Sequence, residues 1–197
     1  MPVRIQKSQT SPSEIETTCK FVLSKIEDMN KTQPYGRWDY DLYRGESCEN
    51  IVVELLQSLG IEAGRYHQSF LKNAGHLIRA CQVDIWVRGG FTGKIYQMET
   101  KTRWVRSGSI FDYNPIAVGG CQTWDEKIEA IATKPGRKPI LGMIVVCEKT
   151  GIVRVTNCHP DRQKDWKRVH FCHELSYAVE SGQFVDIIAF SKVLKTL

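Results

Sequence analysis

The chain has 197 residues, of which 42% are hydrophobic and 25% are charged. This composition is typical of a globular protein and excludes a disordered tail, a collagen-like repeat and a coiled-coil rod. Lysine and arginine number 27 against 22 acidic residues, so the formal net charge is +5, an excess that is compatible with a polyanionic partner.

Two helices are predicted in the first sixty residues. The first has Ser13 as its N-cap, with Glu16 in the capping-box position, and ends near Asn30. A turn-rich stretch and an extended segment follow it. The second helix is expected to start after Gly45, to continue with an apolar stripe of helical spacing, and to end at Gly60, which suits a C-cap.

Most of the remaining elements are predicted to be strands. Strand patterns occur at 61–66, 82–87, 94–101, 140–147 and 151–156, and a turn at 89–93 joins the second of these to the third. Helices are expected at 122–133 and 175–179, a last strand at 185–190, and irregular structure at 102–120. This order predicts one α/β domain with a mixed sheet.

The strand pattern at 94–101 indicates a metal site. Because side chains alternate along a strand, Glu99 and Lys101 point to one face, and Thr100 points to the other, toward a helix. Asp84 lies in the neighbouring strand pattern, between Val83 and Ile85, and is expected to face Glu99. Two carboxylates and the carbonyl of Thr100 suit Mg²⁺ or Mn²⁺, and Lys101 would hold an attacking water and neutralise charge on a phosphate.

Two further features point the same way. Glu49 lies near the edge of the apolar stripe of the second helix, from which it would reach the same site. The segment after the lysine interleaves cations and rings, with Arg103, Trp104 and Arg106. Such a pattern suits contacts to phosphates and stacking on bases.

The sequence resembles the PD-(D/E)xK nucleases, and within them the archaeal Holliday-junction-resolvase-like branch and the small homing endonucleases. That family has a glycine, a helical glutamate, a leucine-rich helix ending in glycine, a strand arginine, a strand aspartate and a strand ExK. The matching residues here are Gly45, Glu49, Leu55, Leu56, Gly60, Arg65, Asp84, Glu99 and Lys101. The resemblance covers residues 45 to about 133, and Val83 stands where the family usually has proline.

The resemblance implies a role for each matching polar residue. Asp84 and Glu99 would ligate the metal, and Lys101 would position the water nucleophile. Glu49 would bind a second metal or orient water. Gln122, near the start of the following helix, would touch the lysine or a phosphate. DNA contacts are expected from the basic and aromatic residues Arg65, Arg103, Trp104 and Arg106.

The resemblance also implies a fold and an activity. The fold would be restriction-endonuclease-like, with a central mixed β-sheet and helices on both faces. A single domain over 1–197 would have its core at about 45–156, an N-terminal helical extension at 1–44 and a C-terminal extension at 157–197. The activity would be Mg²⁺-dependent hydrolysis of DNA phosphodiester bonds, of the homing or resolvase type, with Mn²⁺ able to substitute. Cleavage of both strands would require a homodimer.

The location expected from the sequence is the cytoplasm, with no membrane partner. The seven cysteines are odd in number and dispersed, and no two form a CxxC pair. The N-terminus lacks the apolar core of a secretory signal, and no apolar run is long enough for a membrane helix. Reduced thiols are therefore expected.

Several alternatives stay open. The chain could be a restriction endonuclease, or a non-catalytic DNA-binding module on the same fold. Glu46 competes with Glu49 as the helical acid, although a place in the first turn favours a role at the helix dipole. A zinc site is a further alternative, although adjacent Cys and His rarely both reach one metal. Its four ligands would be Cys158, His159, Cys172 and His173.

Overall fold

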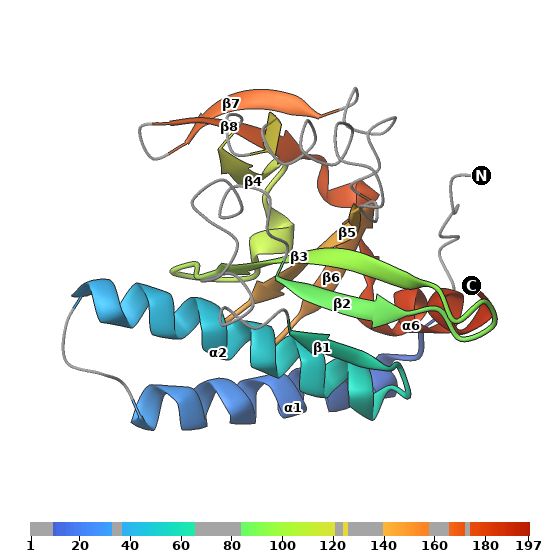
Figure 1. Cartoon of the computed structure of the whole chain (residues 1–197). Coiled ribbons are helices and arrows are strands. Elements are labelled where there is room, and N and C mark those ends of the chain that lie inside the picture. The colour runs from blue at the N-terminus through green and yellow to red at the C-terminus, as the bar shows by residue number, and fades with distance from the viewer. Residues whose placement is uncertain are drawn as a thin grey trace, which may run out of the picture.

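The computed structural model describes residues 10–32, 37–65, 84–120, 124–125, 140–157, 166–171 and 174–197. A six-stranded sheet has the order β1 (Ala63–Arg65), β2 (Ile85–Arg88), β3 (Ile95–Arg103), β5 (Ile140–Cys147), β6 (Val153–Asn157) and β9 (Val185–Asp186). A three-stranded sheet has the order β4 (Ile116–Gly120), β8 (Glu174–Val179) and β7 (Lys167–Phe171). The described α-helices are α1 (Pro12–Lys31), α2 (Arg37–Ser58) and α6 (Ile187–Thr196) (Figure 1).

The first helix starts two residues earlier than predicted. Its N-cap is Ser11, whose hydroxyl accepts the N–H of Glu14 at 3.2 Å, while the Glu14 carboxylate accepts the N–H of Ser11 at 2.9 Å. The predicted cap at Ser13 is therefore wrong. Pro12 explains the difference, because proline is well suited to the first turn of a helix, where its missing N–H needs no partner.

The second helix starts nine residues earlier than predicted, at Arg37 rather than after Gly45. Gly45 lies inside the helix, where glycine is tolerated at a cost of about 1 kcal/mol when the rest of the helix packs well. The extended segment expected before Gly45 is therefore wrong, and Glu46 is not in the first turn. The predicted end is confirmed: Gly60 has φ 77°, and the N–H of Ile61 bonds the carbonyl of Leu56 at 2.9 Å.

The strands around the expected site agree with the prediction. β2 and β3 form an antiparallel hairpin, with Ile85 opposite Met98, and β3 pairs in parallel with β5. β5 and β6 are antiparallel, as expected for 140–147 and 151–156. Parallel pairing places the carboxyl ends of β3 and β5 at the same edge of the sheet, and this arrangement brings Glu148 close to the end of β3.

The C-terminal predictions were less successful. Residues 175–179 belong to strand β8 rather than a helix, and 185–190 contains the two-residue strand β9 followed by α6. Residues 102–120, expected to be irregular, include β4. Four successive residues of β8, from Ser176 to Val179, are buried. A strand buried on both faces shows no alternation, so its pattern does not differ from that of a short buried helix.

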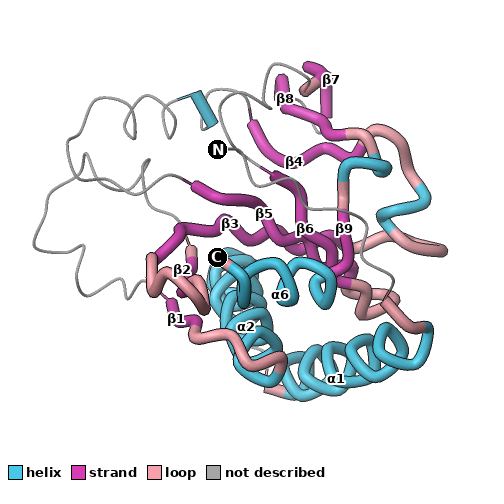
Figure 2. The backbone as a smooth tube through the Cα atoms, turned by 90° about the vertical axis from the view of Figure 1, so that its right-hand side faces the viewer, coloured by secondary structure: helices cyan, strands magenta, loops and turns pink. Residues whose placement is uncertain are grey.

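The two faces of the six-stranded sheet are covered differently. The described helices lie on one face, and the β4–β8–β7 sheet lies on the other side (Figure 2). β5 illustrates the division, because Ile144 packs with the helices and Met143 packs with Trp124 and Trp166. Trp124 packs on the face that carries the three-stranded sheet, so the described residues do not contradict the prediction of helices on both faces. Of the helix expected at 122–133, only Trp124 and Asp125 are described, and both are helical.

The segments expected to be extensions contribute to the core. Val22 and Ile26 of α1, and Phe190 and Leu194 of α6, belong to the same buried apolar cluster as α2. The architecture is thus a mixed α/β fold with a mixed sheet. In the part of the chain that is described, none of the helices has the length and apolarity needed to cross a membrane.

Candidate active site

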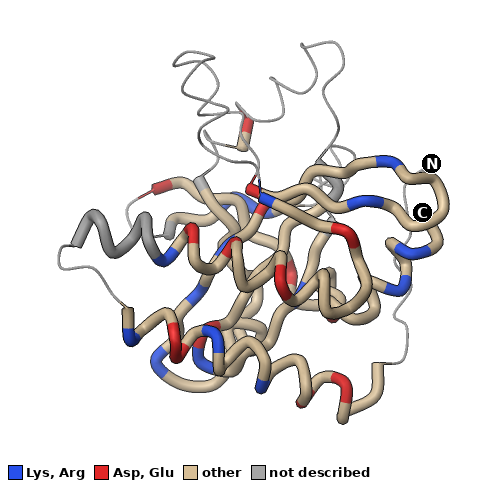
Figure 3. Tube along the Cα trace, turned by 60° about the horizontal axis from the view of Figure 1, so that its bottom comes forward, with Lys and Arg blue, Asp and Glu red and all other residues tan. Residues whose placement is uncertain are grey.

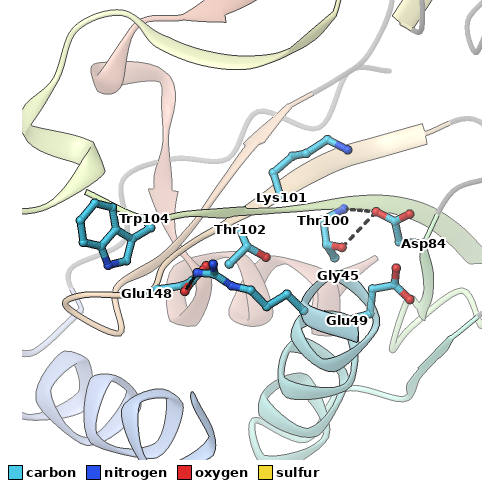
Figure 4. Close-up of a pocket in the computed structure, with 9 residues that line it drawn as sticks. Gly45, Glu49, Asp84, Thr100, Lys101, Thr102, Trp104 and Glu148 are labelled. Carbon is cyan, nitrogen blue, oxygen red and sulfur yellow. Dashed lines mark hydrogen bonds and ion pairs between the residues drawn. The ribbon is translucent and has the colours of Figure 1, made fainter. Parts of the chain in front are cut away.

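A pocket of about 380 Å³ opens between the middle of α2 and the carboxyl end of β3 (Figure 4). Four of the residues that line it were predicted from the sequence to be catalytic or metal-binding. The other five belong to α2, to β3 and to the segments that follow β3 and β5. The nine lining residues are Arg44, Gly45, Glu49, Asp84, Thr100, Lys101, Thr102, Trp104 and Glu148.

Asp84 is held by β3. It lies just before β2, and its Oδ2 accepts the backbone N–H of Thr100 at 2.7 Å and the Thr100 hydroxyl at 3.0 Å. These two bonds fix the carboxylate at the point where β2 and β3 separate, on the pocket side of the sheet (Figure 4). Asp84 thus lines the pocket with its carboxylate anchored to β3.

Glu49 faces Asp84 from the helix. Its Oε2 accepts the Nε of Arg65 at 2.7 Å. Burial, followed by repulsion from Asp84, raises the pKa of Glu49 to about 7, although Arg65 acts in the opposite direction. Arg65 also donates to Asn50 at 3.3 Å. The structure therefore places the guanidinium of Arg65 on Glu49, and the predicted DNA contact of this arginine stays a prediction.

Glu99 lies on the other face of β3. Its side chain is only 2% exposed, and its Oε1 forms an ion pair of 2.7 Å with the Nζ of Lys101. Burial lowers the pKa of Lys101, but the charges of Glu99 and Asp84 outweigh this effect, so that the pKa is raised. Glu99 is not among the pocket residues, and strand alternation puts it on the same face of β3 as Lys101, opposite to Thr100. The predicted Asp84–Glu99 ligand pair is therefore not assembled in the pocket.

The donors in the pocket suit a hard divalent cation. Asp84 and Glu49 supply carboxylate oxygens, and their mutual repulsion is what a cation would neutralise. Within the described ranges, no three His, Cys, Asp or Glu side chains form a group that could hold a metal. Water and substrate oxygens would complete the coordination, as is usual for Mg²⁺.

The sequence analysis missed two charged residues of the pocket. Glu148 follows β5 directly and is 8% exposed, and it accepts a hydrogen bond from the guanidinium of Arg44 on α2. An acid directly after the apolar run 140–147 was a usable signal, because β5 is parallel to the ExK strand. Arg44 had no such signal once the helix was expected to start after Gly45.

The residues predicted to contact DNA lie in different surroundings. Trp104 is 63% exposed and lines the pocket, and Arg106 is exposed in the loop that follows. Arg103 donates to the carbonyls of Ala117 and Thr102 at 3.1–3.4 Å, so it joins β3 to β4 and its predicted DNA contact is not supported. Gln122 lies outside the described residues, as do the four predicted zinc ligands.

Comparison with known proteins does not assign the chain to a family. No protein-family model matches the chain, and no curated protein matches it. The functional argument therefore rests on the chemistry of the pocket and on the order of its elements.

Proposed function

We propose that this chain is a Mg²⁺-dependent DNA endonuclease of the resolvase or homing type, with a restriction-endonuclease-like fold. The observation that carries the proposal is that Asp84, Glu49 and Lys101 all line one pocket, with the side chain of Lys101 on the opposite side of β3 from Glu49 (Figure 4). The order of the elements also supports it. A helix with Glu49 and a terminal Gly60 precedes β1 with Arg65, then Asp84 and β2, and then the ExK strand, which is the order of the PD-(D/E)xK pattern.

Each residue has a role that its contacts support. Asp84 and Glu49 would hold the metal, and Arg65 orients Glu49 by its ion pair. Lys101 remains protonated through its pair with Glu99 and would stabilise the charge that develops on the phosphate in the transition state. A bound Mg²⁺ would supply polarisation of the phosphate and a more acidic water. In this proposal Glu99 is a positioning residue rather than a ligand.

A non-catalytic DNA-binding module is the second candidate. The burial of Glu99 favours it, because the second carboxylate expected beside Asp84 is engaged with Lys101 outside the pocket. A module of this kind would bind DNA without metal and would not cleave it. For the endonuclease, each copy has one pocket, so we expect a homodimer to cut both strands of a duplex.

Plasmid cleavage in Mg²⁺ or EDTA tests the proposal. The wild-type chain is expected to nick or linearise DNA in Mg²⁺ only, and Asp84→Ala is expected to abolish cleavage. Asp28→Ala, an exposed acid on α1, provides the matched control and should cleave normally. A four-way junction and long genomic DNA should be tested beside the plasmid, because the preferred substrate separates a resolvase from a site-specific enzyme. DNA binding without cleavage of any substrate would leave only the module.

A further inference from the structure

The pocket extends beyond the acidic residues along β3. Thr100, Thr102 and Trp104 occupy alternate positions, so they lie along one side of the chain, with Asp84 and Glu49 at one end and Trp104 and Glu148 at the other (Figure 4). Four residues of extended chain span about 13 Å at 3.3 Å per residue. This length exceeds the 3.4 Å rise of one stacked base step along a DNA strand, so the two ends of the pocket are far enough apart to contact different parts of one strand.

At the end of the pocket near Trp104, the guanidinium of Arg44 is held in place by an ion pair. Arg44 reaches the pocket from α2 and is 25% exposed, and its NH2 group donates to the buried carboxylate of Glu148. An arginine has five N–H donors in a planar fork. The bond to Glu148 anchors one edge of that fork, and the side chain lines the cavity beside Thr102 and Trp104. A planar cation held in this way suits a phosphate oxygen.

Trp104 supplies an aromatic surface at the same end. Its side chain is 63% exposed and lines the pocket, whereas Trp124 and Trp166 are buried. An exposed indole binds a base by stacking only if that base has left the duplex stack. Continuous B-form DNA offers no free base face, so the arrangement favours DNA with an unpaired nucleotide next to the scissile phosphate.

We infer that Arg44 and Trp104 form a nucleotide subsite, with Glu148 as its positioning residue, and that the substrate has an unpaired nucleotide beside the cut. Arg44 binds the phosphate of that nucleotide and Trp104 stacks on its base. This inference rests on the proposed function for the position of the cut, but the subsite itself can be tested without cleavage.

The test measures binding to a labelled blunt duplex and to the same duplex with a short unpaired tail. The Asp84→Asn chain in EDTA is used, so that no cleavage occurs. We expect the tailed duplex to bind about tenfold tighter, the effect of roughly one stacked base. Trp104→Ala in this chain should reduce its affinity to that for the blunt duplex.

A double variant without charges, called the neutral pair, distinguishes phosphate binding by Arg44 from a purely structural role. Arg44→Gln/Glu148→Gln keeps two hydrogen-bonding side chains and leaves the net charge unchanged, so it should unfold like the parent chain and yet lose the preference for the tail. The matched control is Arg88→Gln/Glu62→Gln, an exposed Arg–Glu pair outside the pocket, which should keep the preference.

Three results overturn the inference: equal binding of tailed and blunt duplex by the parent chain, a preserved preference in the neutral pair, or a preserved preference in Trp104→Ala. Cleavage is then measured separately with Asp84 restored. Tail preference without any cleavage overturns the endonuclease and keeps the subsite. Cleavage without tail preference keeps the endonuclease and overturns the subsite.

Discussion

The pocket contains two carboxylates, Asp84 and Glu49, whose negative charges repel each other when no metal is bound. Burial and the charge of Asp84 raise the pKa of Glu49 from 4.5 to about 7. A group whose pKa is raised on folding stabilises the folded state while it is protonated, and this contribution is lost as the pH rises through the folded pKa. The stability of the metal-free chain should therefore decrease between about pH 4.5 and pH 7 as Glu49 ionises.

Glu49→Gln should remove this decrease. The amide oxygen can still accept the hydrogen bond from Arg65, but it carries no charge to repel Asp84. In EDTA at about pH 8 the variant should be more stable than wild type by about 2–3 kcal/mol, and near pH 4 the two should be alike. Denaturant unfolding at a series of pH values measures the difference. A difference that does not change with pH would contradict the prediction.

The Glu99–Lys101 pair predicts a stability effect that is distinct from catalysis. Lys101→Met would leave Glu99 buried without its cation, and breaking a buried pair from one side is costly. Because Lys101 is 30% exposed, we expect a loss of about 2 kcal/mol rather than the full cost of a buried pair. Glu99→Met/Lys101→Met should recover most of that stability, since both charges are gone. Cleavage should be absent from both variants, so recovered cleavage would exclude the role proposed for Lys101.

At the scale of the element, α2 positions the site through its length and its end. The helix runs through Gly45, so that Arg44 and Glu49 both reach the pocket from its middle. Its end at Gly60 turns the chain directly into β1, where Arg65 meets Glu49. The geometry of Glu49 therefore depends on both the helix and its C-cap.

Replacing Gly60 and Gly45 by alanine should change the stability of the protein in opposite directions. Gly60→Ala places a side chain at φ 77°, which costs about 1–2 kcal/mol. Gly45→Ala places its methyl group in open space inside the helix, and should stabilise the protein by about 0.5–1 kcal/mol. Thermal unfolding of the two variants beside wild type measures both effects. A loss of stability in Gly45→Ala would mean that the helix is interrupted there.

At the scale of the whole molecule, the second sheet shares a core with the first. Trp166 packs edge-on against Trp124 at 5.4 Å and against Tyr177 at 5.7 Å, and Met143 of the six-stranded sheet belongs to the same buried cluster. The helices on the other face carry charges of both signs along their length (Figure 3). Lys20 and Lys25 on these helices are paired with Glu16 and Glu54, so we expect DNA to bind at the pocket rather than on the outer surface of α1.

The shared core predicts one cooperative unfolding transition. Trp166→Ala should lower the stability of the whole chain by about 3–5 kcal/mol, because it opens a cavity between the layers. Circular dichroism of the helices and fluorescence of the remaining tryptophans should shift together. Two separate transitions would show that the β4–β8–β7 sheet unfolds independently, in conflict with the single domain expected from the sequence.

Local patterns were sufficient to predict the elements that carry the proposed catalytic groups. The hairpin at 82–101, the strand at 140–147 and the cap at Gly60 all have signals within a few neighbouring residues. The start of α2 and the fold of 175–190 were predicted wrongly. A glycine inside a helix and a strand buried on both faces depend on packing against distant residues, which a local window does not contain.

The sequence by itself determined the residues that can perform chemistry and their alternation along β3. Alternation is a property of the extended backbone, so it placed Glu99 and Lys101 on one face and Thr100 on the other without reference to the rest of the chain. Tertiary structure decided how these groups are combined. It paired Arg65 with Glu49, enclosed Glu99 with Lys101, and brought Arg44 to Glu148, 104 residues later in the chain. Such pairings follow from the packing of helices on a sheet, since residues far apart in the sequence become neighbours only when the core forms.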